Sequence, residues 1–339
     1  MSLVSLLFWL VVAAVSILLL VTGYLMHVTR RISRQAEKLV PAAGQRITVD
    51  GHDVHYVESG AGRPILMIHG LGGHLHHMRR PLMEAFGDDY RLIAIDRPGS
   101  GYSTRPRGDG RLSQQADFIA HLIDAMQLER PLVVGHSLGG AIALATALRH
   151  PDKISGLALI SPLTHHYSEV PPEFAPLHIP NPVLRRLIAN TVAVPMSARN
   201  APRTLDFVFG PQKPPIDFAV AGGALAGMRP SHIYATSTDL VALRHDLADF
   251  ETRYGEIELP VGILFGDKDR VLDYRRHGLS MRDKIDDLDL EIAEGVGHMP
   301  QYVVTGQVVA FIRRIAARAF QSSTPAAASG DASGETKRA

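Results

Sequence analysis

A serine at the centre of a glycine-flanked pentapeptide is the residue of this chain best suited to act as a nucleophile. Residues 135–139 read Gly-His-Ser-Leu-Gly, directly after the apolar run 132–134 and before a helix-forming run at 141–148. A serine on a sharp strand-to-helix turn projects its hydroxyl above the strand end, and small neighbours let strand and helix close around it. This context predicts that Ser137 is a nucleophile rather than a polar residue in a glycine-rich turn.

A histidine late in the chain is the expected base, because a serine hydroxyl is a weak nucleophile at neutral pH. The chain has 17 histidines, and His298 stands in the segment 294–300, Glu-Gly-Val-Gly-His-Met-Pro. This segment follows the last expected strand, and its glycines let the loop carry the imidazole across the end of the sheet. We therefore predict that His298 takes the serine proton.

A carboxylate must fix the tautomer of that imidazole and stabilise the imidazolium. In the order serine, acid, histidine, the acid should end a strand between positions 137 and 298. Residues 265–270, Phe-Gly-Asp-Lys-Asp-Arg, offer two aspartates. We prefer Asp269, which lies deeper in the turn that must reach His298, and interpret Asp267, beside a lysine, as a solvated loop charge. The preceding strand is followed by 161–164, Ser-Pro-Leu-Thr, which holds no carboxylate.

Two backbone N–H groups must stabilise the developing oxyanion, and losing one such donor typically costs about 3–4 kcal/mol. One expected donor is Leu138, the residue after the nucleophile. The other should come from the loop 69–73, His-Gly-Leu-Gly-Gly, where Leu71 is the candidate. His69 is then expected to brace this loop rather than act as a base.

No cofactor or metal is expected. The chain has no cysteine, which removes disulfides and thiolate ligands. His74, His76 and His77 lack the helical His-x-x-x-His spacing, so they do not predict a metal site.

Short apolar segments alternate with helical ones along most of the chain. This alternation predicts an α/β fold with a mostly parallel sheet covered by helices on both faces. From about 163 to 255, prolines separate short helical stretches and no central strand is expected, so this part is an insertion. The expected strands are 46–49, 54–57, 65–68, 91–95, 132–134, 157–160, 261–265 and 288–292, and the clearest helices are 114–126 and 307–320.

The N-terminal segment predicts a membrane anchor at 1–29, followed by a basic linker at 30–45. Residues 2–28 contain no charged side chain, and a helix of about 26 such residues is ~39 Å long, beyond the ~30 Å hydrocarbon core. A cleaved signal peptide would have basic residues before a shorter apolar run. Arg30, Arg31, Arg34 and Lys38 follow the run, which favours a cytoplasmic catalytic domain.

The overall charge and the composition of the C-terminal tail give less information about function. The 35 basic and 34 acidic residues nearly cancel among 339, so no field favours nucleic acid. The tail 321–339 is rich in Ser, Ala, Gly and Pro and is expected to be disordered.

In residues 46–320 the chain resembles the α/β-hydrolase superfamily. The motifs that carry the resemblance are 69–73, 96–103 (Asp-Arg-Pro-Gly-Ser-Gly-Tyr-Ser), 135–139, 266–269 (Gly-Asp-Lys-Asp) and 297–300 (Gly-His-Met-Pro). The resemblance implies an eight-stranded sheet with a helical lid inserted after the sixth strand, supports Asp269 as the acid, and makes the Asp96 loop structural. The N-terminal helix and the stretch 266–273 are similar to membrane-bound monoacylglycerol lipases.

A serine nucleophile, rather than a carboxylate, points to acyl transfer. We expect a membrane-anchored serine hydrolase that cleaves carboxylic esters, lipid or other hydrophobic acyl esters above all, through an acyl-enzyme on Ser137. A C–C bond hydrolase with the same triad and a non-catalytic membrane-tethered binding protein are the alternatives. The apolar residues of the insertion, such as Phe174, Leu184 and Phe209, either accept acyl chains or form the core of the lid. No oligomeric state follows from the sequence.

Overall fold

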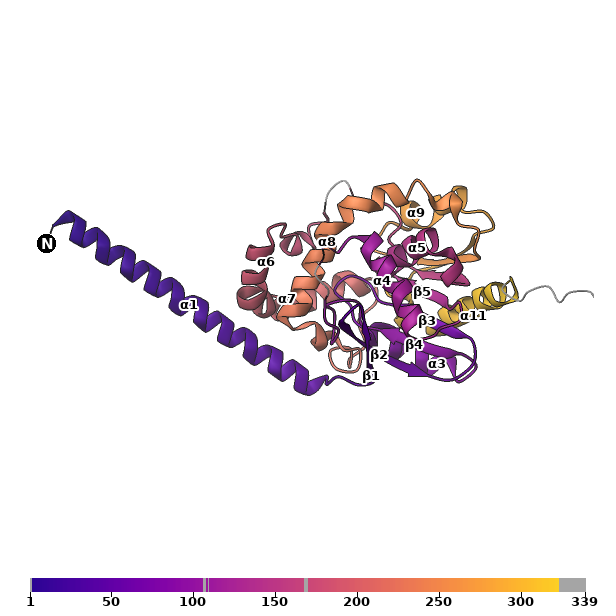
Figure 1. The fold of residues 1–339 in the computed structure, drawn as a ribbon, viewed down its shortest axis with the longest axis horizontal. Helices are drawn as coiled ribbons and strands as arrows, with labels where there is room; N and C mark the ends of the chain where they lie inside the picture. Colours follow the sequence, from indigo (N-terminus) through magenta and orange to yellow (C-terminus); the bar gives the residue numbers. More distant parts are fainter. Residues whose placement is uncertain (1, 106–107, 109, 168–169, 323–339) are drawn as a thin grey trace, which may run out of the picture.

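An eight-stranded sheet forms the centre of the computed structural model, which describes residues 2–105, 108, 110–167 and 170–322 (Figure 1). The strand order is β1-β2-β4-β3-β5-β6-β7-β8; β2 pairs antiparallel with β1 and β4, and the other pairings are parallel. The predicted α/β fold with a mostly parallel sheet is confirmed. The strands are β1 (Gln45–Val49), β2 (His52–Ser59), β3 (Pro64–Ile68), β4 (Arg91–Ile95), β5 (Leu132–His136), β6 (Gly156–Ile160), β7 (Val261–Gly266) and β8 (Asp289–Ala293).

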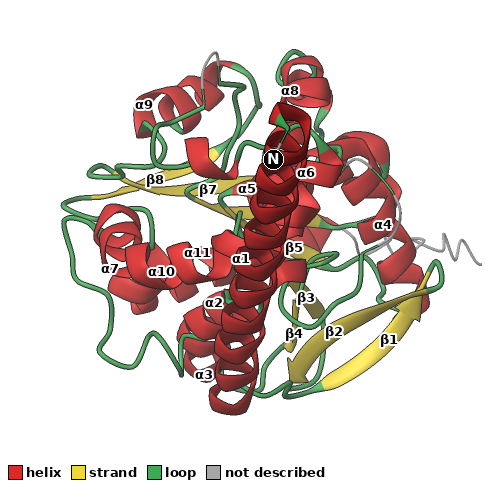
Figure 2. Cartoon of the chain, turned by 90° about the vertical axis from the view of Figure 1, so that its left-hand side faces the viewer, coloured by secondary structure: helices red, strands yellow, loops and turns green. Residues whose placement is uncertain are grey.

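Helices cover both faces of the sheet because its central strands are apolar on both sides (Figure 2). In β3, Leu66 and Ile68 pack on one side and Ile65 and Met67 on the other, as alternation along a strand requires. The first side carries α4 (Leu112–Ala125), α5 (Leu138–Arg149) and α8 (Pro230–Phe250). The second carries α2 (His76–Met78), η1 (Arg79–Met83), α3 (Glu84–Phe86) and α11 (Thr305–Ser322).

In its described part the insertion between β6 and β7 consists of helices joined by loops and turns, without a strand, and its helices are longer than the prolines suggested. Pro195 and Pro230 stand in the first turns of α7 and α8, where a missing N–H costs nothing, and Pro202 lies inside α7. The elements are η3 (Ala175–Leu177), α6 (Pro182–Ile188), η4 (Ala189–Ala193), α7 (Val194–Phe209), η5 (Ala224–Gly227), α8 and η6 (Tyr254–Glu256). The remaining helices are η2 (Pro151–Lys153), α9 (Tyr274–His277), η7 (Leu279–Asp283) and α10 (Pro300–Val303).

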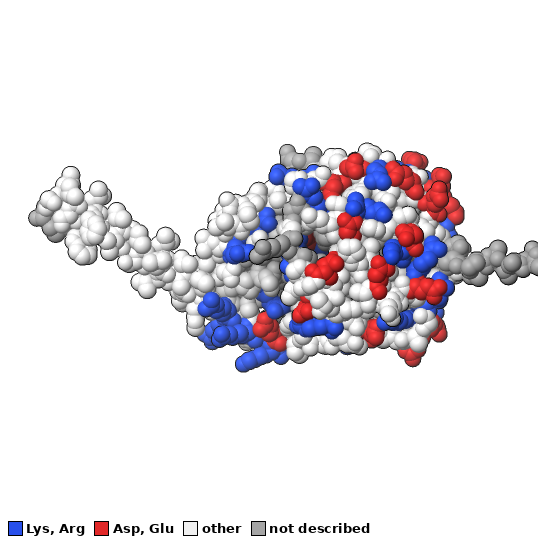
Figure 3. Space-filling view, viewed as in Figure 1, with Lys and Arg blue, Asp and Glu red and all other residues white. Residues whose placement is uncertain are grey.

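The N-terminal helix α1 (Leu3–Leu39) is longer than the expected anchor and continues through most of the segment expected to be a linker. Its second half stays helical because Thr29, Ser33 and Ala36 are buried against the insertion. Its first half projects from the body and carries no charged side chain (Figures 1 and 3). Within the described residues, α1 alone is long and apolar enough to cross a membrane.

The predicted disordered tail falls largely outside the described residues. Residues 321 and 322 form the end of α11, and 323–339 are not described.

Candidate active site

Ser137 occupies a strained turn between β5 and α5. Its φ is +55° and its ψ is −118°, a conformation that non-glycine residues rarely adopt. The neighbouring backbone holds it there, because the Ser137 N–H donates to the Ile160 carbonyl (3.1 Å) and its carbonyl accepts from Leu163 (3.0 Å). A Cβ at Gly135 would come within 2.7 Å of the Gly140 nitrogen, so the strand and the helix close as the pentapeptide predicted. Ser137 remains partly exposed.

Asp269 and His298 meet at the carboxyl ends of β7 and β8. His298 Nδ1 lies 2.7 Å from Asp269 Oδ2, and the side chains are 5% and 0% exposed. Asp269 Oδ1 accepts the N–H groups of Val271 and Leu272 at 2.8 and 2.9 Å. Both carboxylate oxygens are thus held in place, in an orientation that lets Oδ2 accept a hydrogen bond from the imidazole N–H.

Asp267, interpreted from the sequence as a solvated loop charge, has a bracing contact as well. Its Oδ1 accepts the Gly295 N–H at 2.6 Å, and its Oδ2 pairs with Lys268 Nζ at 2.8 Å. The hydrogen bond from Lys268 lowers the pKa of Asp267. This aspartate therefore ties the end of β7 to the loop that carries His298.

Ser137 is linked to the Asp269–His298 pair through its neighbour. His136 Nε2 lies 2.9 Å from the backbone carbonyl of His298, and the two rings are 4.9 Å apart. Burial, and then the nearby His298, lower the pKa of His136, which keeps this ring neutral. Among the described residues, Ser137 Oγ and the His298 ring are not hydrogen-bonded, and such contacts often form only in the substrate complex.

Sequence reasoning missed His136 and a second brace of the histidine loop. Gln212, in the insertion, donates to the Gly295 carbonyl (2.6 Å) and accepts the Gly297 N–H (3.1 Å). His136 stood inside the recognised pentapeptide, but its partner is 162 residues away. No local pattern marks Gln212.

The loop 69–73 lies directly against the nucleophile. A Cβ at Gly70 would fall 2.9 Å from the Ser137 Cβ, so only glycine permits this approach. His69 accepts the Arg97 N–H at Nε2 (3.0 Å) and donates to the Gly70 carbonyl from Nδ1 (2.8 Å), which is the bracing position that we expected. Leu71 follows in this loop and Leu138 begins α5, so both remain the predicted oxyanion donors.

A buried ion pair ties the same loop to the insertion. Arg97 donates to the carbonyls of His69 (3.1 Å) and Gly70 (3.0 Å), and its Nη1 lies 2.7 Å from Asp239 on α8. Arg97 is 1% and Asp239 0% exposed at the side chain, and Arg105 also approaches Asp239 to 2.8 Å. The ion pair thus fixes the loop 69–73 to α8 of the insertion.

The three clustered histidines pack against one another. The rings of His74 and His77 are 4.6 Å apart, and those of His74 and His76 5.4 Å. Burial lowers the pKa of His77 to about 3. In the described ranges, no group of three or more His, Asp or Glu residues is arranged to hold a metal ion.

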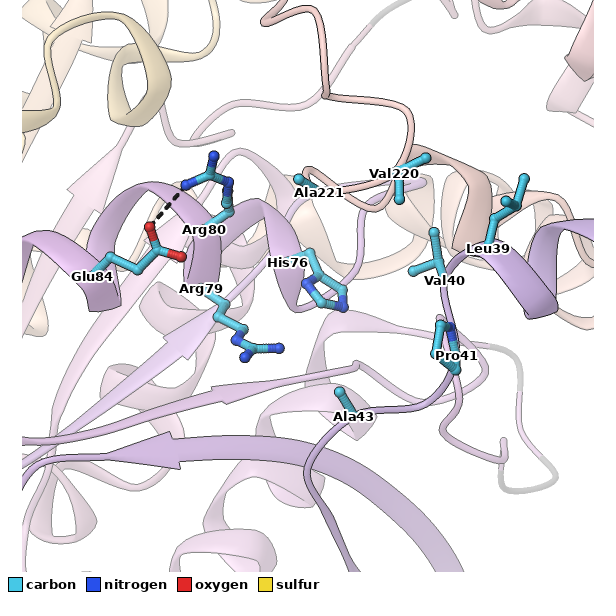
Figure 4. Close-up of a pocket in the computed structure, with 10 residues that line it drawn as sticks. All are labelled: Leu39, Val40, Pro41, Ala43, His76, Arg79, Arg80, Glu84, Val220 and Ala221. Carbon is cyan, nitrogen blue, oxygen red and sulfur yellow. Dashed lines mark hydrogen bonds and ion pairs between the residues drawn. The ribbon is translucent and has the colours of Figure 1, made fainter.

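A hollow of about 340 Å³ lies apart from Ser137, Asp269 and His298, at the end of α1 (Figure 4). It is bounded by Val40, His76, Val220 and the Arg80–Glu84 ion pair (2.8 Å). None of Ser137, Asp269 and His298 lines it, so it is not the candidate active site.

The fold and the residues at the carboxyl ends of its parallel strands define a class of protein. Residues 63–303 match the family described as the alpha/beta hydrolase fold. The chain belongs to this family, which indicates a hydrolase.

Individual relatives differ in chemistry. The chain is 38% identical over 128 residues to the dihydrolipoyllysine-residue acetyltransferase component of the acetoin cleaving system of Cupriavidus necator, covering 38% of this chain and 34% of that protein. It is 37% identical over 124 residues to 2-hydroxymuconate semialdehyde hydrolase of Pseudomonas sp. (strain CF600), covering 35% and 44%. These matches span less than half of the curated relatives.

A solved structure matches almost end to end. It is a membrane phospholipase A, described as a bacterial virulence factor, with 28% identity and a TM-score of 0.65. The match covers 93% of this chain and 98% of the phospholipase.

Proposed function

We propose that this protein is a membrane-anchored serine hydrolase that cleaves carboxylic esters, with lipid or other hydrophobic acyl esters as the substrate class. The observation that carries the proposal is the buried Asp269–His298 hydrogen bond of 2.7 Å at the sheet edge where the strained turn exposes Ser137. A serine, an imidazole and a carboxylate at one edge support acyl transfer rather than opening of epoxides or haloalkanes, which requires a carboxylate nucleophile.

The reaction follows from the roles of these groups. Ser137 Oγ attacks the ester carbonyl carbon while His298 Nε2 takes its proton, and Asp269 stabilises the imidazolium. The N–H groups of Leu71 and Leu138 stabilise the oxyanion. His298 returns the proton to the leaving alcohol, which leaves an acyl group on Ser137. A water molecule, deprotonated by His298, then attacks the acyl carbon; the bond to Ser137 Oγ breaks, His298 returns the proton to Oγ, and the acid is released.

The membrane location is supported by α1 and by the membrane phospholipase A structure. The basic residues after residue 28 favour a catalytic domain on the cytoplasmic side. A reporter fused to the C-terminus tests this orientation, and activity confined to the outside of the cytoplasm would contradict it.

A C–C bond hydrolase is the second candidate, favoured by the similarity to 2-hydroxymuconate semialdehyde hydrolase over 124 residues. The same three side chains serve such a reaction. Measured kcat/KM on a meta-cleavage product against a p-nitrophenyl ester separates the two candidates.

Covalent labelling tests the proposed nucleophile. The full-length protein in membranes should react with a fluorophosphonate probe and hydrolyse p-nitrophenyl esters, and Ser137→Ala should lose both activities. Ser155→Ala is the matched control, because Ser155 is a buried serine at the opposite end of the sheet, before β6. For a lipid esterase, kcat/KM should rise from acetate to decanoate. Retained labelling in Ser137→Ala would refute the nucleophile, and a steady decline with chain length would refute the lipid substrate.

A further inference from the structure

Helix α6 of the insertion directs its apolar residues outward and an arginine inward. Val183, Leu184 and Leu187 are 77%, 47% and 51% exposed, and their spacing of three and four residues places them on one face. Arg185 is buried; its Nη1 donates to Thr238 Oγ1 on α8 (2.7 Å) and its Nε to the Ile179 carbonyl (2.9 Å). A surface helix in water shows the reverse arrangement, with its apolar stripe toward the core.

This apolar face lies beside the end of the apolar half of α1. Helix α6 leads directly into η4, where the Thr191 carbonyl accepts a hydrogen bond from the Thr29 hydroxyl. Thr29 directly precedes Arg30, the first charged residue after the apolar stretch. In Figure 1, α6 lies on the side of the body from which the first half of α1 projects. A bilayer crossed by residues 2–28 would therefore end at the level of α6.

Basic side chains surround the same level. Arg30, Arg31, Arg34 and Lys38 are exposed on α1, and Arg186 is exposed on α6. Figure 3 shows basic side chains gathered where α1 meets the body. Cations at this depth match anionic lipid headgroups. Apolar residues flanked by basic ones are the pattern of a helix that lies in the membrane interface.

We infer that the face of α6 formed by Val183, Leu184 and Leu187 lies in the headgroup region of the bilayer that α1 crosses. The inference rests on the proposed membrane anchoring. The lid is then attached to the membrane at two places, by the packing of α1 on η4 and by α6 itself. A lid held in this way keeps a fixed orientation toward a bilayer that contains acyl esters.

The absence of cysteine makes a site-specific test direct. Leu187→Cys and, separately, Val183→Cys are labelled with an environment-sensitive fluorophore in the full-length protein. The labelled protein is reconstituted in phosphatidylcholine–phosphatidylglycerol vesicles with or without lipids that carry a quencher near the headgroup. Leu10→Cys, in the expected span, reports anchoring, with quenching measured for lipids labelled deeper in the acyl chain. Ala317→Cys is the exposed control, on α11 at the opposite end of the body in Figure 1.

We expect quenching of roughly twofold or more at positions 187 and 183, quenching at position 10, and none at 317. Quenching at 10 without quenching at 187 or 183 would overturn the α6 inference and leave the anchor intact. Absence of quenching at all positions would refute the anchor itself. Cross-linking of position 187 between two copies, without lipid quenching, would assign this face to a second copy of the chain and also overturn the inference.

Discussion

Two buried aspartate–histidine pairs in this protein have the same geometry and different surroundings. In both Asp269–His298 and Asp96–His55, a carboxylate Oδ2 lies 2.7 Å from the imidazole Nδ1. His55 Nε2, however, lies 2.6 Å from the Ala43 carbonyl, so acceptors occupy both ring nitrogens. For His298, no described protein group is hydrogen-bonded to Nε2. An aspartate–histidine pair can exchange protons with a substrate only if one ring nitrogen is left free.

The two carboxylates also differ in the backbone N–H groups that they accept. Asp96 accepts the N–H groups of Leu75 (2.8 Å) and Tyr102 (2.9 Å), so it joins three separate segments of chain. The Asp269 carboxylate accepts its two N–H groups from its own turn. The first pair therefore acts as a structural junction, as expected for the Asp96 loop, and the second as an orienting device for one ring.

The largest effect is expected from Asp269→Asn. The amide keeps the shape but favours the wrong tautomer of His298, so kcat for a p-nitrophenyl ester should fall by about 10⁴-fold. Steady-state kinetics on full-length protein, with thermal unfolding to confirm folding, provides the measurement. A kcat within tenfold of the wild type would remove Asp269 from the mechanism.

Removing the carboxylate of the other pair should affect stability instead. Asp96→Ala leaves His55 and two backbone N–H groups buried without their acceptor, and removing one partner of a buried pair costs about 3–5 kcal/mol. The thermal midpoint should fall steeply, while kcat per folded molecule should change far less than in Asp269→Asn.

An exposed pair provides the control for that comparison. Asp50 and His121 are also 2.7 Å apart, but their side chains are about half exposed. His121→Ala, which leaves the left-handed backbone of Asp50 (φ +51°) untouched, should cost at most about 1 kcal/mol. Equal losses of stability in His121→Ala and Asp96→Ala would mean that burial does not distinguish the pairs.

How much could be predicted from the sequence depends on the range of the interactions. Local patterns predicted the strands, the turn at Ser137 and the choice of Asp269 over Asp267. The structure has the expected eight-stranded, mostly parallel sheet and a contact between Asp269 and His298. The second role of Asp267, the His136 contact and the Gln212 brace depend on residues distant in sequence. The continuation of α1 past position 29 was missed because its stabilising partner, η4, begins at Ala189.

The roles of the apolar residues of the insertion also could not be predicted from local sequence. The sequence left open whether they bind acyl chains or form the core of the lid, and the structure divides them. Phe209 is fully buried against Phe218 and Met299, whereas Leu184 is exposed on α6. Composition alone cannot separate these fates, since both depend on which helix faces which neighbour.

Asp239 is a third buried carboxylate, and we expect it to support catalysis although it belongs to neither pair. Asp239→Asn removes the charge that holds Arg97, and Arg97 holds the carbonyls of the loop with the Leu71 donor. A displaced oxyanion donor should lower kcat by about 10- to 100-fold with a smaller change in KM. Asp246→Asn is the control, because Asp246 lies on the same helix and caps α4 instead. Equal kinetics in the two variants would contradict this role.

The last prediction concerns a buried histidine whose hydrogen bonds differ from those of His55. His232 Nδ1 accepts the Gly101 N–H (3.1 Å) while its Nε2 donates to the Gly72 carbonyl (3.1 Å), an arrangement that requires a neutral ring. Burial lowers the pKa of His232 to about 4 from its ordinary 6.5. Between these values the unfolded chain binds a proton that the native chain does not, so the stabilisation is complete above pH 6.5. It declines as the pH falls toward 4, by up to about 1.4 kcal/mol per pH unit.

The pH dependence of unfolding isolates this contribution. The free energy of unfolding should fall more steeply between pH 6.5 and 4.5 in the wild type than in His232→Gln, which cannot take up the proton. Parallel curves for the wild type and His232→Gln would contradict a His232 ring that stays neutral in the native protein while the unfolded chain takes up its proton.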